Sequence, residues 1–302
     1  MKTRSAALLL ALVLCSPTAA AARDLTGARS MALGGALRAQ PAGVAGPLLN
    51  PAGLSMARMY SISAIYQYRG SDQASQMNAA VIDSVTAKLA AGLFYSFTHA
   101  SPERTLALPN GAYKLEETLN THEVGLSLAY PLGNIAMIGV TGRYVNKQGT
   151  LPDDAPTGLS TADVSRFTMD VGGLVRLGQL FSVAVVGYNL IAVGDRDFPR
   201  SLGLGAAFTP APVLSLMFDS VIDFSSDPEK AKASFHGGAE VFLAKMYAIR
   251  GGAMHDMLRR ASYVTGGLGL VSRRIGVEFG LRQMVDGGSE TLVSFQLQLF
   301  LQ

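Results

Sequence analysis

The C-terminal end of the sequence alternates between apolar and polar side chains. The apolar members are Val293, Phe295, Leu297, Leu299 and Leu301. The polar members between them are Ser294, Gln296, Gln298 and Gln302, and Phe300 is the one exception. Because successive side chains of a β-strand point to opposite faces, this pattern predicts a strand with one apolar and one polar face. Such strands are typical of a barrel whose interior is wet and whose outer face meets lipid.

Segments of this kind recur from about Arg58 to the C-terminus, separated by turn residues. We predict about fourteen strands, near 58–69, 76–86, 88–98, 118–130, 134–147, 164–177, 179–191, 200–209, 212–224, 233–243, 246–254, 260–271, 273–285 and 290–301. The segments 76–86 and 179–191 are the weakest, because both of their faces are apolar or small.

The predicted connections alternate in length. The short ones are 85–87, 131–133, 178, 210–211, 244–245 and 272. The longer ones are 70–75, 99–117, 148–163, 192–199, 225–232, 255–259 and 286–289. Outer-membrane barrels join their strands by short periplasmic turns and longer outer loops. The order therefore predicts an even strand number with both chain termini in the periplasm.

Composition and export signals favour the same fold. Lys2 and Arg4 precede the apolar run 6–14, and small residues up to Ala22 follow, so residues 1–22 are predicted to be a secretory signal peptide. Leu14 is too large for a lipidation site at Cys15, although that alternative stays open. Only 16% of residues are charged, yet no later segment approaches the 18 or more apolar residues of a spanning helix. A closed barrel is the other structure that satisfies its backbone groups in lipid.

The predicted polar faces carry charges of both signs. Their members are Lys88, Glu123, Arg143, Asp170, Arg176, Asp219, Asp223, Glu240, Arg250, Arg274, Glu278 and Arg282. We interpret them as lumen-facing groups that pair with one another, because inward charges are stabilised by partners before they imply a substrate. An ion-selective pore would need a ring of one sign. The net charge of +3 is spread among acids, so no nucleic-acid surface is predicted.

Tyrosines near strand ends are predicted to form aromatic girdles at the two membrane interfaces. They are Tyr60, Tyr66, Tyr68, Tyr95, Tyr130, Tyr144, Tyr188, Tyr247 and Tyr263.

Residues 23–57 do not alternate and are rich in small side chains. The segment contains GARSMALGGA at 27–36 and LNPAGL at 49–54. A free linker is usually more polar, so we predict a compact plug inside the barrel formed by 58–302. A barrel of about fourteen strands is wider than the eight-stranded ones that side chains alone fill.

These two motifs resemble the N-terminus of the FadL-type outer-membrane transporters and their PorV/PorQ-like relatives. The resemblance covers about thirty residues by motif and implies a fourteen-stranded barrel with an N-terminal hatch. It places the hatch motif at Asn50, Pro51 and Ala52. The residues that shape the hatch would be Gly27, Arg29, Gly34 and Gly35. The GAR…LGGA opening is closer to the PorV/PorQ side, and the outer loops are short for a fatty-acid transporter.

Catalytic, metal and cofactor sites are not predicted. The four histidines lack ligand spacing and no G-x-S-x-G elbow occurs, although a Ser/His outer-membrane lipase stays open. The resemblance favours a barrel in outer-membrane lipid that passes or binds a hydrophobic or amphipathic small molecule. The alternative is a scaffold that receives a secreted or surface protein.

Overall fold

The computed structural model describes residues 26–108, 111–156, 159, 161, 163–227, 229–286 and 288–301. The predicted signal peptide, with Cys15, lies outside the described residues. In the described part of the chain, no helix is both long enough and apolar enough to span a membrane.

Fourteen antiparallel strands close into a barrel, as predicted. They are β1 (Tyr60–Arg69), β2 (Ala74–Asp83), β3 (Ala90–Ala100), β6 (Thr118–Leu132), β7 (Ala136–Thr150), β8 (Val164–Leu177), β9 (Phe181–Tyr188), β10 (Ser201–Ala211), β11 (Leu214–Asp223), β12 (Lys232–Leu243), β13 (Tyr247–Asp256), β14 (Ala261–Val271), β15 (Ile275–Met284) and β16 (Thr291–Leu301). The first and last strands pair along their whole length, from Tyr60 opposite Leu301 to Arg69 opposite Leu292. This pairing leaves no open sheet edge.

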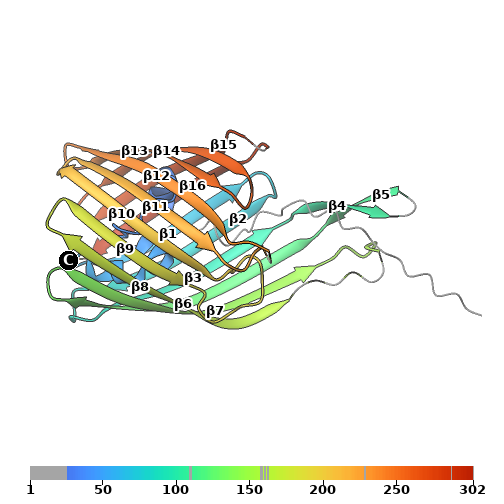
Figure 1. Cartoon of the computed structure of the whole chain (residues 1–302), viewed down its shortest axis with the longest axis horizontal. Coiled ribbons are helices and arrows are strands. Elements are labelled where there is room, and N and C mark those ends of the chain that lie inside the picture. The colour runs from blue at the N-terminus through green and yellow to red at the C-terminus, as the bar shows by residue number, and fades with distance from the viewer. Residues whose placement is uncertain are drawn as a thin grey trace, which may run out of the picture.

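The two ends of the barrel differ in their connections (Figure 1). At one end, here called the turn end, the connections are 84–89, 133–135, 178–180, 212–213, 244–246 and 272–274. The start of β1 and the end of β16 also lie there. The opposite end, here called the loop end, has connections at 70–73, 101–117, 151–163, 189–200, 224–231, 257–260 and 285–290.

One predicted loop contains regular structure. Within 99–117, β4 (Glu103–Leu108) and β5 (Gly111–Glu116) form a separate two-stranded sheet. This hairpin projects beyond the loop end together with the long strands β6 and β7 (Figure 1). The segment 99–117 was predicted only as a long connection, and the hairpin was not anticipated, because it pairs only with itself and stands apart from the barrel alternation.

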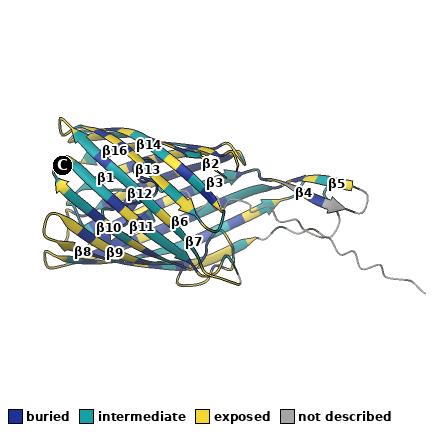
Figure 2. Ribbon diagram, turned by 45° about the horizontal axis from the view of Figure 1, so that its top comes forward, coloured by how far each residue is buried: buried dark blue, intermediate teal, exposed yellow. Residues whose placement is uncertain are grey.

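The barrel strands present alternate residues to the two faces (Figure 2). In β1 the burial pattern alternates residue by residue, with Ile62, Tyr66 and Tyr68 exposed on the outside. Polar residues such as Ser63 and Gln67 lie on the inside and are buried. An apolar outer face and a polar inner face are the arrangement expected in lipid.

Two of the predicted girdle tyrosines lie elsewhere. Tyr263 is buried, and Tyr188 hydrogen-bonds inside the barrel. For these two residues the girdle prediction was wrong, because both lie on the inward side of their strands.

A short helical segment fills part of the barrel. It comprises α1 (Ala28–Ala32), α2 (Ala45–Leu49) and the 3-10 helix η2 (Pro51–Ser55). We call residues 26–57 the plug segment; its ribbon lies within the ring of strands (Figure 1). α1 contacts β13 to β16, whereas η2 contacts β3, β6, β7 and β8. The segment therefore crosses the barrel from one wall to the other.

The plug segment packs against apolar residues of the wall near the turn end. Its Leu33, Leu37 and Leu49 share one buried cluster with wall residues. The wall members are Met137, Leu174, Ala184, Ala207 and Met217. All five lie in the turn-end halves of β7 to β11. Burying such side chains is worth about 1.5–3 kcal/mol each, so this contact contributes strongly to seating the plug.

Candidate functional site

The Asn-Pro-Ala motif lies at the contact between the plug segment and the wall. Asn50 is completely buried. Its Nδ2 donates to the carbonyl of Arg38 at 2.9 Å, and its Oδ1 accepts the Ala52 N–H at 3.1 Å. The asparagine amide thus joins two turns of the plug segment, and an aspartate there would lack the donor.

Two wall glycines make room for this motif. A Cβ added to Gly172 would lie 2.1 Å from the Asn50 Oδ1, and one added to Gly139 would lie 2.4 Å from the Pro51 carbonyl carbon. Both distances are too short for any larger residue without a shift. The plug backbone at Pro51 therefore lies directly against β7 and the Asn50 side chain directly against β8, which leaves no room for water at these two contacts.

The glycine-rich opening of the plug segment makes the matching contact on the other wall. Gly34 has a φ of +67°, and a Cβ there would lie 2.4 Å from the carbonyl oxygen of Ala253. A Cβ on Gly35 would lie 2.8 Å from the ring of His236. The His236 Nδ1 donates to the Gly34 carbonyl at 2.7 Å. Glycine is required here both for the backbone conformation and for the close approach.

Arg29 connects the plug segment to a chain of buried charges. Its guanidinium binds Glu240 with two contacts, at 2.7 and 3.0 Å. Glu240 also binds Arg250 at 2.6 Å, and Arg250 binds Glu278 at 2.8 Å. Burial lowers the pKa of Arg29, but the Glu240 carboxylate outweighs that effect, and the pKa lies above its ordinary value. The arginine therefore stays charged.

A second buried arginine, Arg38, was missed by the sequence analysis. The Asp219 carboxylate accepts the backbone N–H groups of Leu37 and Arg38 at 2.9 and 2.8 Å, and the Arg38 Nη1 at 3.1 Å. The Arg38 Nε donates to the Tyr188 hydroxyl at 2.8 Å, and that hydroxyl donates to the Leu49 carbonyl. A charge standing alone between Arg29 and Arg58 in an apolar segment was the signal that could have identified it.

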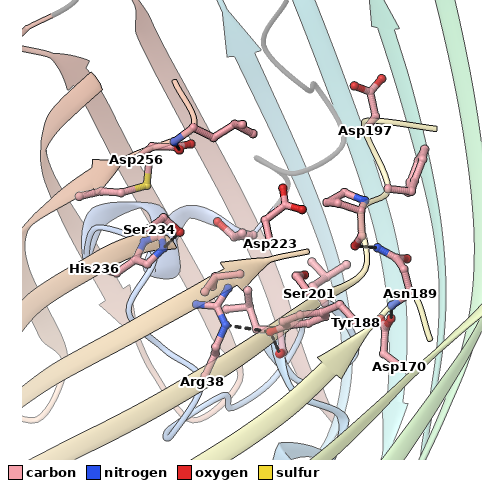
Figure 3. Close-up of a pocket in the computed structure, with 18 of the residues that line it drawn as sticks. Arg38, Asp170, Tyr188, Asn189, Asp197, Ser201, Asp223, Ser234, His236 and Asp256 are labelled. Atoms are coloured by element: carbon pink, nitrogen blue, oxygen red, sulfur yellow. Dashed lines mark hydrogen bonds between the residues drawn. The ribbon is translucent and has the colours of Figure 1, made fainter. Parts of the chain in front are cut away.

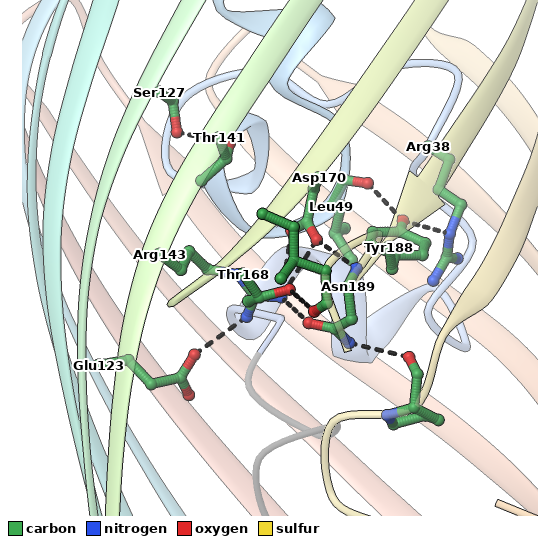
Figure 4. Close-up of polar contacts among 12 residues, drawn as sticks. Arg38, Leu49, Glu123, Ser127, Thr141, Arg143, Thr168, Asp170, Tyr188 and Asn189 are labelled. Atoms are coloured by element: carbon green, nitrogen blue, oxygen red, sulfur yellow. Dashed lines mark hydrogen bonds and ion pairs between the residues drawn. The ribbon is translucent and has the colours of Figure 1, made fainter. Parts of the chain in front are cut away.

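Farther along the same wall, Arg143 gathers the polar groups of β6, β7 and β8 (Figure 4). It lies 3.0 Å from Glu123 and 3.2 Å from Asp170, and it donates to the Asn189 Oδ1 at 2.7 Å. Asn189 in turn donates its Nδ2 to the Pro199 carbonyl at 2.8 Å. This network links the barrel wall to the connection 189–200.

The connection 189–200 folds inward across the loop end. Its Val193 and Phe198 are buried against Val145 of β7. Lys147 binds Asp195 at 3.0 Å and Asp197 at 2.6 Å. We call residues 189–200 the inward loop; apolar and ionic contacts both hold it against β7.

A cavity of about 170 Å³ lies between the plug segment and the loop end (Figure 3). Its wall includes Asp223, Lys232 and Asp256, which lie at the loop ends of β11, β12 and β13. The first described residue, Thr26, also lines it. The inward loop contributes Asp197, Phe198 and Pro199. The cavity therefore lies on the loop-end side of the plug.

Two kinds of surface meet in this cavity. Pro47, Leu48 and Phe94 are apolar, whereas Arg38 and Tyr188 belong to the polar network described above. The remaining charged lining residues are Glu123, Arg143, Asp170, Asp197, Asp223, Lys232, Asp256 and Arg259. Both signs are present, so the cavity has no strong preference for a cation or an anion.

The predicted lumen residues divide into two groups. The structure places nine of them inside the barrel: Glu123, Arg143, Asp170, Asp219, Asp223, Glu240, Arg250, Glu278 and Arg282. The other three, Lys88, Arg176 and Arg274, are exposed at the turn end. For these three the prediction was wrong. Their sequence positions match the inward-facing residues of the neighbouring strand. At each of them, however, the strand has ended or has reached the rim of the barrel.

Within the described residues, no group of three or more His, Cys, Asp or Glu side chains is arranged to hold a metal ion. His236 faces the lumen and lines the cavity, but its ring nitrogens bind Ser234 and Gly34.

Comparison with known proteins identifies the fold. No protein-family model and no curated protein sequence matches the chain. Solved structures do match over nearly the whole chain. The toluene transporter TbuX of Ralstonia pickettii has a TM-score of 0.75 and 15% identity, covering 92% of this chain and 100% of its own. The toluene transporter TodX of P. putida gives 0.73 and 13%, covering 92% and 100%.

A Pseudomonas aeruginosa FadL homologue gives a TM-score of 0.69 and 10% identity, covering 91% of this chain and 98% of its own. Identities this low leave the sequence-level relationship unassigned, whereas the TM-scores and coverage are those of a shared architecture. The fold of this chain is that of the FadL-type outer-membrane transporters.

Proposed function

We propose that this protein is an outer-membrane channel that binds an amphipathic small molecule in the loop-end cavity and passes it inward when the plug segment shifts. The observation that carries the proposal is the cavity itself, which places an apolar surface and a hydrogen-bonding surface around one space. Sites for small organic ligands combine these two surfaces in the same way.

Size and charge narrow the ligand. A cavity of about 150 Å³ holds a molecule the size of benzene, so the 170 Å³ present here suits a ligand with one ring or a short chain. Several lining charges have ion-pair partners, for example Arg143 with Asp170 at 3.2 Å and Lys232 with Asp227 at 3.2 Å. A neutral or zwitterionic ligand with polar groups could hydrogen-bond to them, whereas a bare hydrocarbon would leave them desolvated without compensation.

The similar structures support passage of hydrophobic molecules in general, since two of them are toluene transporters. The charged lining of this cavity leads us to propose a more polar cargo. We favour passage through the plug over passage through the wall, because a lateral exit would need a break in the pairing of the strands. In the described residues the ladders between barrel strands show one register shift, between Phe208 and Ala211 near the turn end.

The proposal includes an orientation and a processing step. Residues 1–22 would be removed as a signal peptide, 23–57 would act as the hatch, and 58–302 would span the membrane. The turn end would face the periplasm. Asn50, Pro51 and Ala52 would hold the hatch closed, with Gly27, Arg29, Gly34 and Gly35 shaping its contact with the wall.

Ligand binding can be tested with one tryptophan, because the sequence contains none. In Leu48→Trp the reporter would stand in the apolar wall of the cavity. We expect saturable quenching by single-ring amphiphiles such as phenylalanine amides, and weaker quenching by toluene. Val85→Trp, exposed in the turn-end connection 84–89, is the matched control. Equal, non-saturable quenching in both variants would contradict the proposal.

A docking role is the second candidate, and the projecting β4–β5 hairpin favours it. In this case a PorV-like barrel would receive a secreted or surface protein at its loop end. Replacing 103–116 by a short Gly-Ser turn should then abolish co-purification of the partner while ligand quenching is retained. Unchanged co-purification would exclude the hairpin as the docking element.

A further inference from the structure

The turn end of the barrel carries an uneven distribution of charge. Its chain segments are 56–60, 83–90, 131–136, 176–181, 209–214, 243–247 and 271–275, together with Leu301. The cationic residues in these segments are Arg58, Lys88, Arg176, Lys245, Arg273 and Arg274, and all of them are exposed. Asp83 is the one acidic residue there. Its Oδ1 already accepts the N–H groups of Val85 and Thr86 in its own turn.

Exposed apolar residues stand directly beside these cations. Leu89 follows Lys88, Leu177 follows Arg176 and Ile275 follows Arg274. The exposed fractions of the three apolar residues are 47%, 55% and 44%. Long cationic side chains at the edge of an apolar belt can keep their stems along the apolar surface and place their charge at headgroup level.

A groove beside the start of β1 and the end of β16 combines cationic and apolar side chains. Arg58 and Arg273 line it together with Phe300 and Leu301, and its volume is about 290 Å³. The Arg58 Nη2 donates to the Val85 carbonyl, which orients that guanidinium at the rim. Guanidinium groups bind phosphate through two parallel hydrogen bonds, and an apolar surface beside them suits the start of an acyl chain.

The loop end lacks this character. Its connections mix both signs, with Asp227 bound to Lys232 at 3.2 Å and Glu290 bound to Arg282 at 2.8 Å. Exposed cations such as Arg166 and Arg200 lie there among acids. A surface of one sign is therefore confined to the turn end.

We infer that the turn end binds anionic phospholipid headgroups of the membrane leaflet around it, with the groove between Arg58 and Arg273 as the tightest site. The cations come from different turns around the rim and lie next to the lipid-facing belt. An acidic protein would need a continuous basic patch on one side of the barrel, whereas a leaflet that surrounds the barrel contacts the cations of every turn. Basic residues near an anionic leaflet gain favourable electrostatic energy that salt reduces.

The test uses the full chain in nanodiscs that contain equal amounts of phosphatidylcholine and phosphatidylglycerol. After transfer to mild detergent, the lipids that remain bound are counted by mass spectrometry. We expect the wild type to retain phosphatidylglycerol over phosphatidylcholine by about threefold or more, since two guanidinium groups face the phosphate. Arg58→Gln/Arg273→Gln should lose that preference. The matched control Arg166→Gln/Arg200→Gln removes two exposed cations at the loop end and should keep it.

Folding is checked by heat-modifiable migration in detergent gels. If the double glutamine variant fails to fold, Arg58→Lys/Arg273→Lys is compared with Arg273→Gln alone. The lysine variant keeps both charges and should retain more of the preference than Arg273→Gln. Equal retention of the two lipids by the wild type would overturn the inference, as would equal loss in the groove and control variants.

Discussion

The two halves of the lumen are built differently, although the same strands form both. Towards the turn end, the plug segment packs against Met137, Leu174 and Ala207, and glycines on the wall let its backbone approach closely. Towards the loop end, the same strands present Asp170, Ser201 and Asp223 to a cavity. One half is tightly packed and the other is polar with open space. This difference indicates that closure of the lumen by the plug and binding of a ligand in the cavity would take place in separate layers of one barrel.

The wall accommodates both layers by changing residue type along a strand. In β10, Ser201 lines the cavity while Ala207 packs against the plug. In β8, Asp170 joins the Arg143 network while Leu174 belongs to the apolar cluster. Changes in the packed layer should therefore alter stability and closure, whereas changes in the cavity layer should alter binding and access.

The largest effect is expected from Asp219→Ala. The change leaves the Arg38 guanidinium and two backbone N–H groups without their buried partner. Loss of one member of a buried pair costs about 3–5 kcal/mol, measured as the free energy of unfolding by urea in lipid vesicles. Asp227→Ala is the control, because its pair with Lys232 is partly exposed and such pairs are worth about 0–1 kcal/mol. Equal losses in the two variants would contradict the stabilising role of the buried Asp219–Arg38 pair.

Leu174→Ala should have the next largest effect. Leu174 is 1% exposed within the cluster that contacts the plug. Truncating a buried leucine costs about 2–5 kcal/mol, read from the same unfolding experiment. Leu177→Ala, on the same strand but 55% exposed on the outer face, should cost clearly less. If Leu177→Ala costs as much, the plug contact is not the source of the stability.

Gly172→Ala tests the close contact between the hatch motif at Asn50 and β8. The added Cβ would lie 2.1 Å from the Asn50 Oδ1, whereas one on the neighbouring Gly173 would lie 3.6 Å from its nearest atom. Overpacking of this kind costs about 1–3 kcal/mol. We expect ion currents across planar bilayers in Gly172→Ala and none above the wild-type level in Gly173→Ala. Silent bilayers with both variants would show that the motif does not control closure.

Lys147→Gln should have the smallest effect on global stability. Lys147 and its partners are largely buried, but they hold only the inward loop, which can open and return Asp195 and Asp197 to water. It removes the cation that binds Asp195 and Asp197 and loosens the inward loop. We expect faster proteolysis within 189–200 and a smaller loss of unfolding free energy than in Leu174→Ala, because the barrel and the plug contact stay intact. A resistant loop in Lys147→Gln would mean that Phe198 packing alone holds it.

The sequence was sufficient to predict the barrel and its fourteen strands, because an outer face in lipid enforces strict alternation. The alternation is weakest in the predicted strands 76–86 and 179–191, and the structure explains why. The inner faces of β2 and β9 meet the apolar plug, through Ile82 against Leu54 and Ala184 against the Leu33 cluster. The inward residues at these plug contacts are therefore apolar as well, and the alternation fades there.

The site was only partly predictable. Strand parity identified Glu123, Asp170 and Glu240, but it could not show where a strand leaves the lumen, so Lys88 and Arg274 were placed inside. The inward fold of 189–200 depends on contacts with Val145 and Lys147 that are distant in the sequence. No local pattern encodes such contacts.

The most direct measurement compares two cysteines on one strand. Ser201→Cys lies at the cavity and Ala207→Cys lies at the plug contact, both on the inner face of β10. A small, membrane-impermeant methanethiosulfonate reagent is added outside intact cells, and the labelling rates are compared. A cavity open towards the loop end and closed by the plug predicts fast labelling of Ser201→Cys and protection of Ala207→Cys. Equal rates, or faster labelling of Ala207→Cys, would contradict the account.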